Sequence, residues 1–156
     1  MARIESSIIV QESIENVFAF LNKCESHRNF IPRMTALKQT SPGIFGQVGT
    51  TLSGMLNYFG IPIPVRYEII AVEPNQLLAM KGKMGPVLFR DGYALRRNGV
   101  GTELKFWLEL APTGWAKLFF PFMGLVGKIH AWETLRNLKR ELAEEIATSG
   151  RTPSSQ

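Results

Sequence analysis

The chain contains a single aspartate, Asp91, against twelve glutamates, and its position makes it the first candidate for chemistry. If one strand runs through this segment, Asp91 shares a face with Phe89 and Tyr93, because alternate residues of a strand point to the same side. A carboxylate on an apolar face needs a partner or a proton. Asp91 is therefore predicted to bind a ligand hydroxyl or to act as a base. The dipeptide Asp91-Gly92 is equally typical of a two-residue turn, which would place the carboxylate in solvent, and both interpretations stay open.

The two histidines are the other candidates for moving a proton or binding a metal. His27 follows Cys24 by three residues, but a zinc site needs a second pair of ligands and Cys24 is the only cysteine. We therefore predict that these two residues form a pair on a helix surface, and we predict no metal site. His130 is predicted to be a helix residue that flanks the core. With Asp91 it is a candidate catalytic residue.

The familiar catalytic and cofactor motifs are missing from the sequence. There is no Gly-x-Ser-x-Gly elbow to place a serine nucleophile. The run from Gly124 to Lys128 is too short for a phosphate-binding loop and lacks the Ser or Thr of that motif. The glycines of residues 43–49 do not match a dinucleotide fingerprint, and we interpret them as a turn that leads into a strand. We therefore predict no cofactor.

Short strand-like segments, separated by turn signals, make up most of the chain. Apolar–polar alternation over residues 3–11 predicts a first strand. Ser13 suits a helix N-cap, which predicts a short helix over 14–22, and a second short helix is predicted over 24–30. Connections between the later segments are too short for crossover helices, so the sequence predicts a curved antiparallel meander. Its six strands are predicted at 34–40, 50–59, 65–72, 77–83, 87–96 and 102–110.

The C-terminal third is predicted to form one long helix. Aromatic residues before it, such as Phe119, fall on the opposite side of the helix, so we place a kink or break near Pro121, Gly124 and Gly127. The polar residues 148–156 are predicted to be a disordered tail, which leaves one domain over residues 1–147. The apolar residues of the helix are three or four positions apart, which is typical of a buried face: Leu125, Ile129, Trp132, Leu135, Leu138, Leu142 and Ile146.

Several stretches are characteristic in combination: Ile4-Glu-Ser-Ser-Ile8, the helix start at 13–21, Phe30-Ile-Pro32, residues 67–74, residues 93–104 and the closing helix. With this order of elements the chain resembles the START-like superfamily, also called polyketide cyclase/dehydrase-like or SRPBCC. The resemblance implies an α+β helix-grip fold, in which a curved seven-stranded antiparallel sheet wraps around the long C-terminal helix. It also implies a large cavity between the sheet and that helix.

In such a fold the apolar face of each strand should point into the cavity. The large apolar groups and few polar ones on these faces, Val65 among them, predict a hydrophobic pocket, and Met80, Met84 and Met123 suit an adaptable part of its lining. The predicted ligand-binding residues are Leu52, Leu56, Tyr58, Tyr67, Ile69, Met80, Phe89, Asp91, Tyr93, Phe106, Leu108, Phe119, Phe122, Val126 and Ile129.

We therefore expect a protein that binds or transports a small hydrophobic ligand, such as a lipid, a quinone or a polyketide-like aromatic. Asp91 or a tyrosine would orient the polar end of that ligand. The alternative is an enzyme, a cyclase, dehydratase or isomerase that acts on a hydrophobic or polyketide-like substrate in the same cavity. In that case Asp91 or His130 would move a proton. The proteins that the chain resembles include carriers, receptors and a few enzymes, so the resemblance leaves the choice open.

Residues 115–123, from Trp115 to Met123, combine six large apolar side chains with one lysine and one proline. Three interpretations of this segment stay open: the first turns of the closing helix buried against the sheet, a hinged gate of the cavity, or a patch for transient membrane contact. A fourth hypothesis, of a different kind, is an interaction module in which the same patch docks a protein.

Charge and composition argue against several other classes of protein. The formal net charge is +5, from 18 Lys and Arg against 13 Asp and Glu. These basic residues are scattered without a run of five, so no nucleic-acid partner is predicted. No secretory signal is recognisable and no apolar segment is long enough to cross a bilayer. We expect a cytoplasmic protein, either a monomer or a homodimer.

Overall fold

In a computed structural model, which describes residues 2–150, the chain forms its elements in the order that the sequence predicts. The elements are β1 (Ala2–Val10), α1 (Ile14–Leu21), α2 (Cys24–Phe30), β2 (Met34–Gln39), β3 (Thr51–Tyr58), β4 (Ile61–Glu73), β5 (Leu77–Met84), β6 (Val87–Asn98), β7 (Gly101–Pro112), the short 3-10 helix η1 (Gly114–Phe119) and α3 (Phe120–Gly150).

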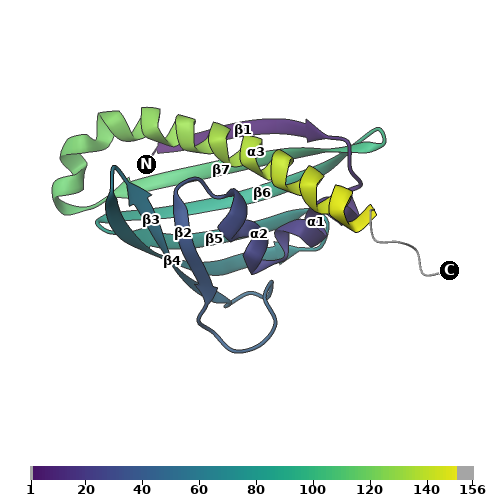
Figure 1. Cartoon of the computed structure of the whole chain (residues 1–156). Helices are drawn as coiled ribbons and strands as arrows, with labels where there is room; N and C mark the ends of the chain where they lie inside the picture. The colour runs from purple at the N-terminus through teal and green to yellow at the C-terminus, as the bar shows by residue number, and fades with distance from the viewer. Residues whose placement is uncertain (1, 151–156) are drawn as a thin grey trace.

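The seven strands form one antiparallel sheet in the order β1-β7-β6-β5-β4-β3-β2. Strands β2 to β7 are a meander, and β1 pairs with β7 along its whole length, from Ala2 opposite Leu110 to Val10 opposite Thr102. The sheet curves around α3, and α2 contacts both β2 and α3 (Figure 1). The predicted α+β helix-grip fold, with a curved antiparallel sheet and two short helices after the first strand, is therefore confirmed.

Strand β4 begins at Ile61, four residues earlier than predicted, and so contains Pro62 and Pro64. In this stretch β4 is paired with β3, and its pairing with β5 starts only at Val65. Proline has no N–H to donate, and it is tolerated where a strand has a neighbour on one side only. The two prolines therefore lie within the strand, and the start predicted at residue 65 is wrong by four residues.

His27 lies in the core, and the predicted helix-surface pair with Cys24 is wrong. Its side chain is fully buried against the rings of Phe30 and Tyr93, with centroid distances of 5.0 and 5.9 Å. Burial lowers the pKa of the imidazole to about 4. The neutral ring can then donate from Nε2 to the carbonyl oxygen of Leu21, 2.7 Å away, which satisfies one of its two nitrogens inside the protein.

A kink or a break was predicted near Pro121, Gly124 and Gly127; α3 continues through all three residues, so a break is wrong. The helix type changes earlier, from 3-10 to α, where η1 ends at Phe119 and α3 begins at Phe120. The helix also extends to Gly150, three residues beyond the predicted domain boundary. The rest of the predicted tail, residues 151–156, lies outside the described residues.

The two halves of α3 pack differently. In the second half, Leu135, Leu138 and Leu142 are buried as predicted. In the first half, the predicted inward residues point to solvent: Leu125, Ile129 and Trp132 are 62%, 44% and 56% exposed.

The small residues of α3 explain this difference. Gly127 and Ala131 are buried at the sheet, and a Cβ at Gly127 would lie only 2.2 Å from Cδ1 of Ile4. The backbone of α3 can approach β1 this closely only on its small-residue side. That approach turns the large apolar side chains of the first half outward.

Gly82 allows a second close contact, on the inner face of the sheet. It lies between Tyr67 on β4 and Phe89 on β6. A Cβ at this position would lie 2.3 Å from the carbonyl oxygen of Arg66 and 2.4 Å from Cζ of Phe89. The missing side chain lets the Tyr67 and Phe89 rings meet edge to face, with centroids 5.2 Å apart.

We expect Gly82→Ala to lower the free energy of unfolding by about 2 kcal/mol or more, because the added methyl overpacks a site bounded by backbone. Gly124→Ala is the matched control. No atom lies within 4 Å of its added methyl, and alanine favours a helix interior by about 1 kcal/mol over glycine. Urea unfolding followed by circular dichroism measures both, and equal stabilities of the two variants would contradict the prediction.

Candidate functional site

Strand β6 runs without interruption from Val87 to Asn98, so Asp91 lies within a strand and its interpretation as a turn residue is wrong. Asp91 is opposite Met80 on β5 and Leu108 on β7. Gly92 has a different role from a turn glycine. The Trp107 indole lies against it on the outer face, where a Cβ would come within 2.6 Å of the ring.

A cavity of about 100 Å³ lies between the inner face of the sheet and the first half of α3. Its deep part includes Tyr67, Asp91 and Leu108, which are all buried, whereas Val126 is 50% exposed and marks the end that reaches the surface. The lining residues are Leu56, Tyr58, Val65, Tyr67, Met84, Val87, Phe89, Asp91, Leu108, Leu110, Met123, Val126, Gly127 and His130.

Asp91 is a buried carboxyl group without a partner. Its cross-strand neighbours Met80 and Leu108 are apolar, and its Oδ1 atom accepts no hydrogen bond from any described residue. Burial raises the pKa of this carboxyl to about 7, because desolvation disfavours the charged form. Near neutral pH the group is therefore close to half protonated, and it can either donate or accept a proton.

His130 is a half-buried residue of α3, as predicted for a helix residue that flanks the core, and it lines the same cavity. Its Nδ1 atom is buried and has no hydrogen-bond partner in the described part of the chain. Burial, with a smaller contribution from the nearby Arg33 guanidinium, lowers the pKa of this imidazole to about 4. At neutral pH the ring is uncharged and can exchange hydrogen bonds with a ligand.

Two tyrosines complete the polar part of the lining. Burial raises the pKa of the Tyr67 phenol well above its ordinary value, and a charge on Asp91 would raise it too. At the outer end, the Arg33 guanidinium lies 5.3 Å from the Tyr58 ring centroid and forms an ion pair with Glu133 of α3. Through Arg33, Tyr58 at the end of β3 is thus linked to α3.

The cavity therefore combines apolar walls with four polar groups that are neutral or nearly so at pH 7. Asp91 and His130 form no hydrogen bond with each other among the interactions of residues 2–150. A ligand between them could bond to both. An acid whose pKa is close to the surrounding pH is also suited to general acid–base chemistry.

The structure sorts the predicted site residues into three groups. Leu56, Tyr58, Tyr67, Phe89, Asp91, Leu108, Val126 and His130 line the cavity. Leu52, Ile69, Met80, Tyr93 and Phe106 are buried core residues that do not line it. Phe119, Phe122 and Ile129 are exposed on the outside, 51%, 67% and 44% respectively.

The cavity is also lined by three residues that the sequence did not predict to be part of its lining. Val87 and Leu110 share the strand alternation of Phe89 and Leu108, so extending each strand by two residues would have identified them. Gly127 has no side chain and gave no signal of its own. Its place in the lining follows from the close approach of α3 to β1.

A larger hollow, of about 980 Å³, lies on the opposite, outer face of the sheet. Outward-facing charged residues such as Arg66, Lys81, Lys83 and Arg90 line it, and it is open to solvent. We assign the candidate site to the smaller internal cavity, because two buried polar atoms without partners among the described residues, Asp91 Oδ1 and His130 Nδ1, line it and none lines the outer hollow.

The geometry agrees with a known family. A family profile described as "Polyketide cyclase / dehydrase and lipid transport" matches residues 1–143. The chain belongs to this family. The predicted resemblance to START-like, polyketide cyclase-like proteins is thereby confirmed. None of the curated proteins matches the chain.

Solved structures share the fold at low sequence identity. The Zhui aromatase/cyclase of Streptomyces sp. R1128 has a TM-score of 0.79 and 10% identity, covering 93% of this chain and 95% of that one. The protein TTHA0849 of Thermus thermophilus has a TM-score of 0.78 and 12% identity, with coverages of 92% and 99%. Ara h 8.0201 has a TM-score of 0.71 and 13% identity, covering 92% of this chain and 98% of that one. At such identities the likeness shows the fold alone.

Two further findings concern residues 2–150. They contain no group of three or more His, Cys, Asp and Glu side chains that could bind a metal ion. No helix within them is both long and apolar enough to cross a membrane.

The raised pKa of Asp91 predicts a specific pH dependence of stability. The pKa of this carboxyl is near its ordinary value of 3.8 in the unfolded chain and about 7 in the folded protein. Its contribution to stability is therefore fully present below about pH 4 and is lost as the pH rises through about 7. Asp91→Asn cannot ionise, so it should match the wild type near pH 4 and exceed its stability by roughly 4 kcal/mol above pH 7.

Urea unfolding of both proteins between pH 4 and 8 measures this difference. The buried histidines are present in both proteins and cancel from the comparison. Glu73→Gln, at an exposed position, controls for the loss of a surface charge. A stability difference between Asp91→Asn and wild type that does not change with pH would contradict the assignment of a buried, unpaired carboxyl.

Proposed function

We propose that the protein binds a small hydrophobic ligand in the internal cavity, with Asp91 and His130 bonding to the polar group of that ligand. The observation behind this proposal is that two buried polar atoms, Asp91 Oδ1 and His130 Nδ1, line one apolar cavity and have no partner among the described residues. A buried polar atom without a hydrogen bond costs about 1–3 kcal/mol. A hydroxyl or carbonyl group of a ligand would supply the missing bonds.

The size and walls of the cavity support a compact ligand. Its volume of about 100 Å³ is below the roughly 300–1,000 Å³ of sites that enclose drug-sized molecules. A single ring suits the deep part, and a second fused ring or a tail would extend past Val126 toward the surface. The flexible side chains of Met84 and Met123 can adapt to ligands of different width. The family description, which includes polyketide and lipid ligands, agrees with this class.

A pair of probes tests the proposal: naphthalene, and 2-naphthol, which differs from it by one hydroxyl. We expect both to bind the folded protein at one site, measured by isothermal titration calorimetry. 2-Naphthol should bind about 5- to 100-fold more tightly, because its hydroxyl adds a hydrogen bond worth about 1–3 kcal/mol. Asp91→Leu should reduce that ratio while naphthalene still binds.

The position of the site is tested by filling it. Val65 is 1% exposed and lines the cavity, whereas Val100 is 89% exposed and lies between β6 and β7. Val65→Phe should weaken 2-naphthol binding by about tenfold or more, since the added ring occupies the ligand volume. Val100→Phe is the matched control and should bind as the wild type does. No saturable binding, or binding that Val65→Phe leaves intact, would contradict the proposal.

A second candidate function, proton transfer on a bound substrate, is favoured by the pKa of Asp91 near 7. As a carboxylate, Asp91 would take a proton from the carbon next to a carbonyl. The enolate formed would be stabilised by hydrogen bonds from neutral groups such as the Tyr67 phenol. Return of the proton to a different atom would complete an isomerisation. Attack of the enolate carbon on a second carbonyl of the same substrate, with the proton passed to the alkoxide formed, would complete a cyclisation, and neither reaction changes the overall oxidation state.

The bicyclic ketone 2-tetralone tests this second function. In D₂O its α-hydrogens exchange through the enolate, and proton NMR follows the loss of their signal. The protein should accelerate the exchange, and Asp91→Asn should lower the catalysed rate by about 100-fold or more, the range of general-base contributions. If 2-tetralone bound saturably but its exchange were not accelerated, the binding function would stand and proton transfer on such ketones would be excluded.

A further inference from the structure

The outer surface of η1 and of the first half of α3 is unusually apolar. Trp115, Phe119 and Phe122 are 66%, 51% and 67% exposed. Exposed apolar patches of this extent on a folded domain usually mark sites of protein or membrane contact. We call this surface the apolar face; its members are Trp115, Leu118, Phe119, Phe120, Phe122, Leu125, Val126, Ile129 and Trp132, each at least 38% exposed.

The apolar face is on the side of α3 opposite to the sheet. At about 100° per residue, Phe122, Leu125 and Ile129 fall on one side of the helix, and Gly127 and Ala131 fall on the other. The inward side already has its contacts, with Ile4, Leu110 and the cavity. This part of α3 is therefore apolar on two sides, and the structure covers only one of them.

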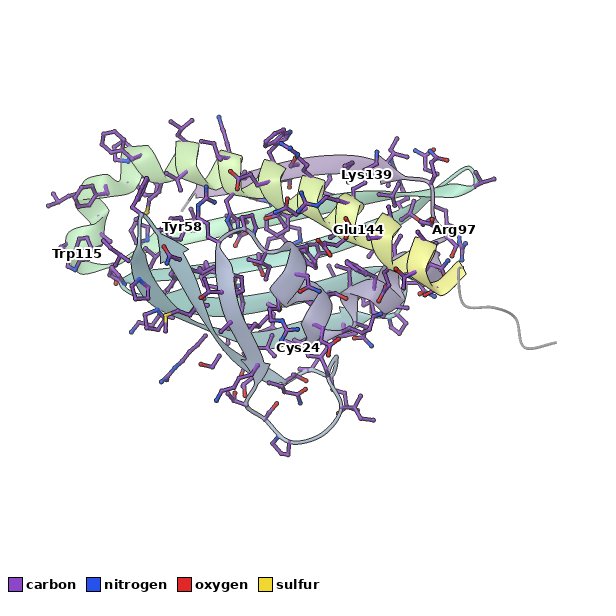
Figure 2. The ribbon with its side chains drawn as sticks, viewed as in Figure 1. Cys24, Tyr58, Arg97, Trp115, Lys139 and Glu144 are labelled. Carbon is purple, nitrogen blue, oxygen red and sulfur yellow. The ribbon has the colours of Figure 1, made fainter. Side chains whose placement is uncertain are left out.

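The turn between β3 and β4 adds a second exposed aromatic group. Phe59 is fully exposed and has a φ of 54°, a left-handed conformation that is uncommon for a bulky residue. Its neighbour Tyr58 lines the cavity together with Val126 of α3. Tyr58 and Trp115 lie at the same end of the molecule (Figure 2). The turn and the apolar face thus border the end of the cavity that reaches the surface.

The charged residues within the segment that forms the apolar face are both lysines. No Asp or Glu occurs between Glu109 and Glu133, whereas Lys117 and Lys128 lie within that interval. Arg136 covers the Trp132 ring at 5.1 Å from its centroid. Glu133, at the end of the interval, is paired with Arg33. A surface of this composition complements a negatively charged partner.

We propose that the apolar face and Phe59 dock onto the surface of an anionic lipid bilayer. Tryptophan and phenylalanine beside lysine are typical of segments that lie in the membrane interface, where the rings enter the acyl boundary and the cations meet anionic headgroups. A protein partner or a second copy of the chain would have to supply acidic groups opposite Lys117 and Lys128. Docking in this orientation places the cavity opening beside Val126 against the membrane.

Flotation with lipid vesicles tests the proposal on the full chain without any cavity ligand. We expect binding to phosphatidylcholine vesicles that contain phosphatidylserine, and binding at least about tenfold weaker to phosphatidylcholine alone. The double variant Phe119→Ser, Phe122→Ser should bind the anionic vesicles about tenfold or more weakly. The double variant Lys117→Glu, Lys128→Glu should lose the preference for phosphatidylserine, and added salt should weaken wild-type binding.

Ile44→Ser and Val100→Ser are the matched controls. These residues are 78% and 89% exposed but lie outside the apolar face, and their variants should bind vesicles as the wild type does. Thermal unfolding checks that every variant is folded. Absence of binding to anionic vesicles would overturn the proposal, as would binding that the two serine substitutions leave unchanged. A stable dimer that those substitutions dissociate would assign the face to a second copy instead.

Discussion

The close packing of α3 on β1 determines how the rest of this protein is arranged. Gly127 and Ala131 let the helix backbone approach the sheet, while farther along Leu135 and Leu138 fill the space with side chains. Where the helix presents leucines, the interior is a continuous core. Where it presents glycine and alanine, the sheet residues opposite are left with an unfilled space, and the cavity forms there. The same orientation turns Leu125, Ile129 and Trp132 outward.

Desolvation sets the chemistry of the cavity. Asp91 and His130 are surrounded by apolar walls, so the carboxyl holds its proton to a higher pH and the imidazole loses its proton at a lower one. Both shifts favour the neutral forms. The cavity is accordingly suited to uncharged ligands that offer a hydroxyl or a carbonyl, and an anionic ligand would add to the repulsion from any ionised Asp91.

Local patterns were sufficient for most of the fold but not for the orientation of single residues. Alternation and turn signals predicted the strands to within a few residues, and α2 was predicted with its observed bounds.

Asp91-Gly92 was ambiguous because a turn and a strand both accept that pair. The Trp107 ring packs in the space left by Gly92, which fits a strand at this position. Trp107 belongs to a different strand, so the local sequence around Asp91 could not reveal this contact. His27 was misplaced because its spacing from Cys24 contains no information on burial. The apolar stripe of α3 was recognised, but only the contact of Gly127 with Ile4 determines which side of the helix faces inward.

The pairing of β1 with β7 has a consequence for how the chain acquires its structure. The paired residues are about a hundred positions apart, and β1 also contacts α3. During synthesis the first strand therefore has no neighbours until nearly the whole chain has left the ribosome. Contacts between such distant segments slow folding, because a long loop must close before they form. Until α3 arrives, the part of the inner face that this helix covers, including Phe106 beside His130, is exposed to water and to other chains. The cavity is thus the last part of the protein to be completed, although the sheet residues that line it have already been made.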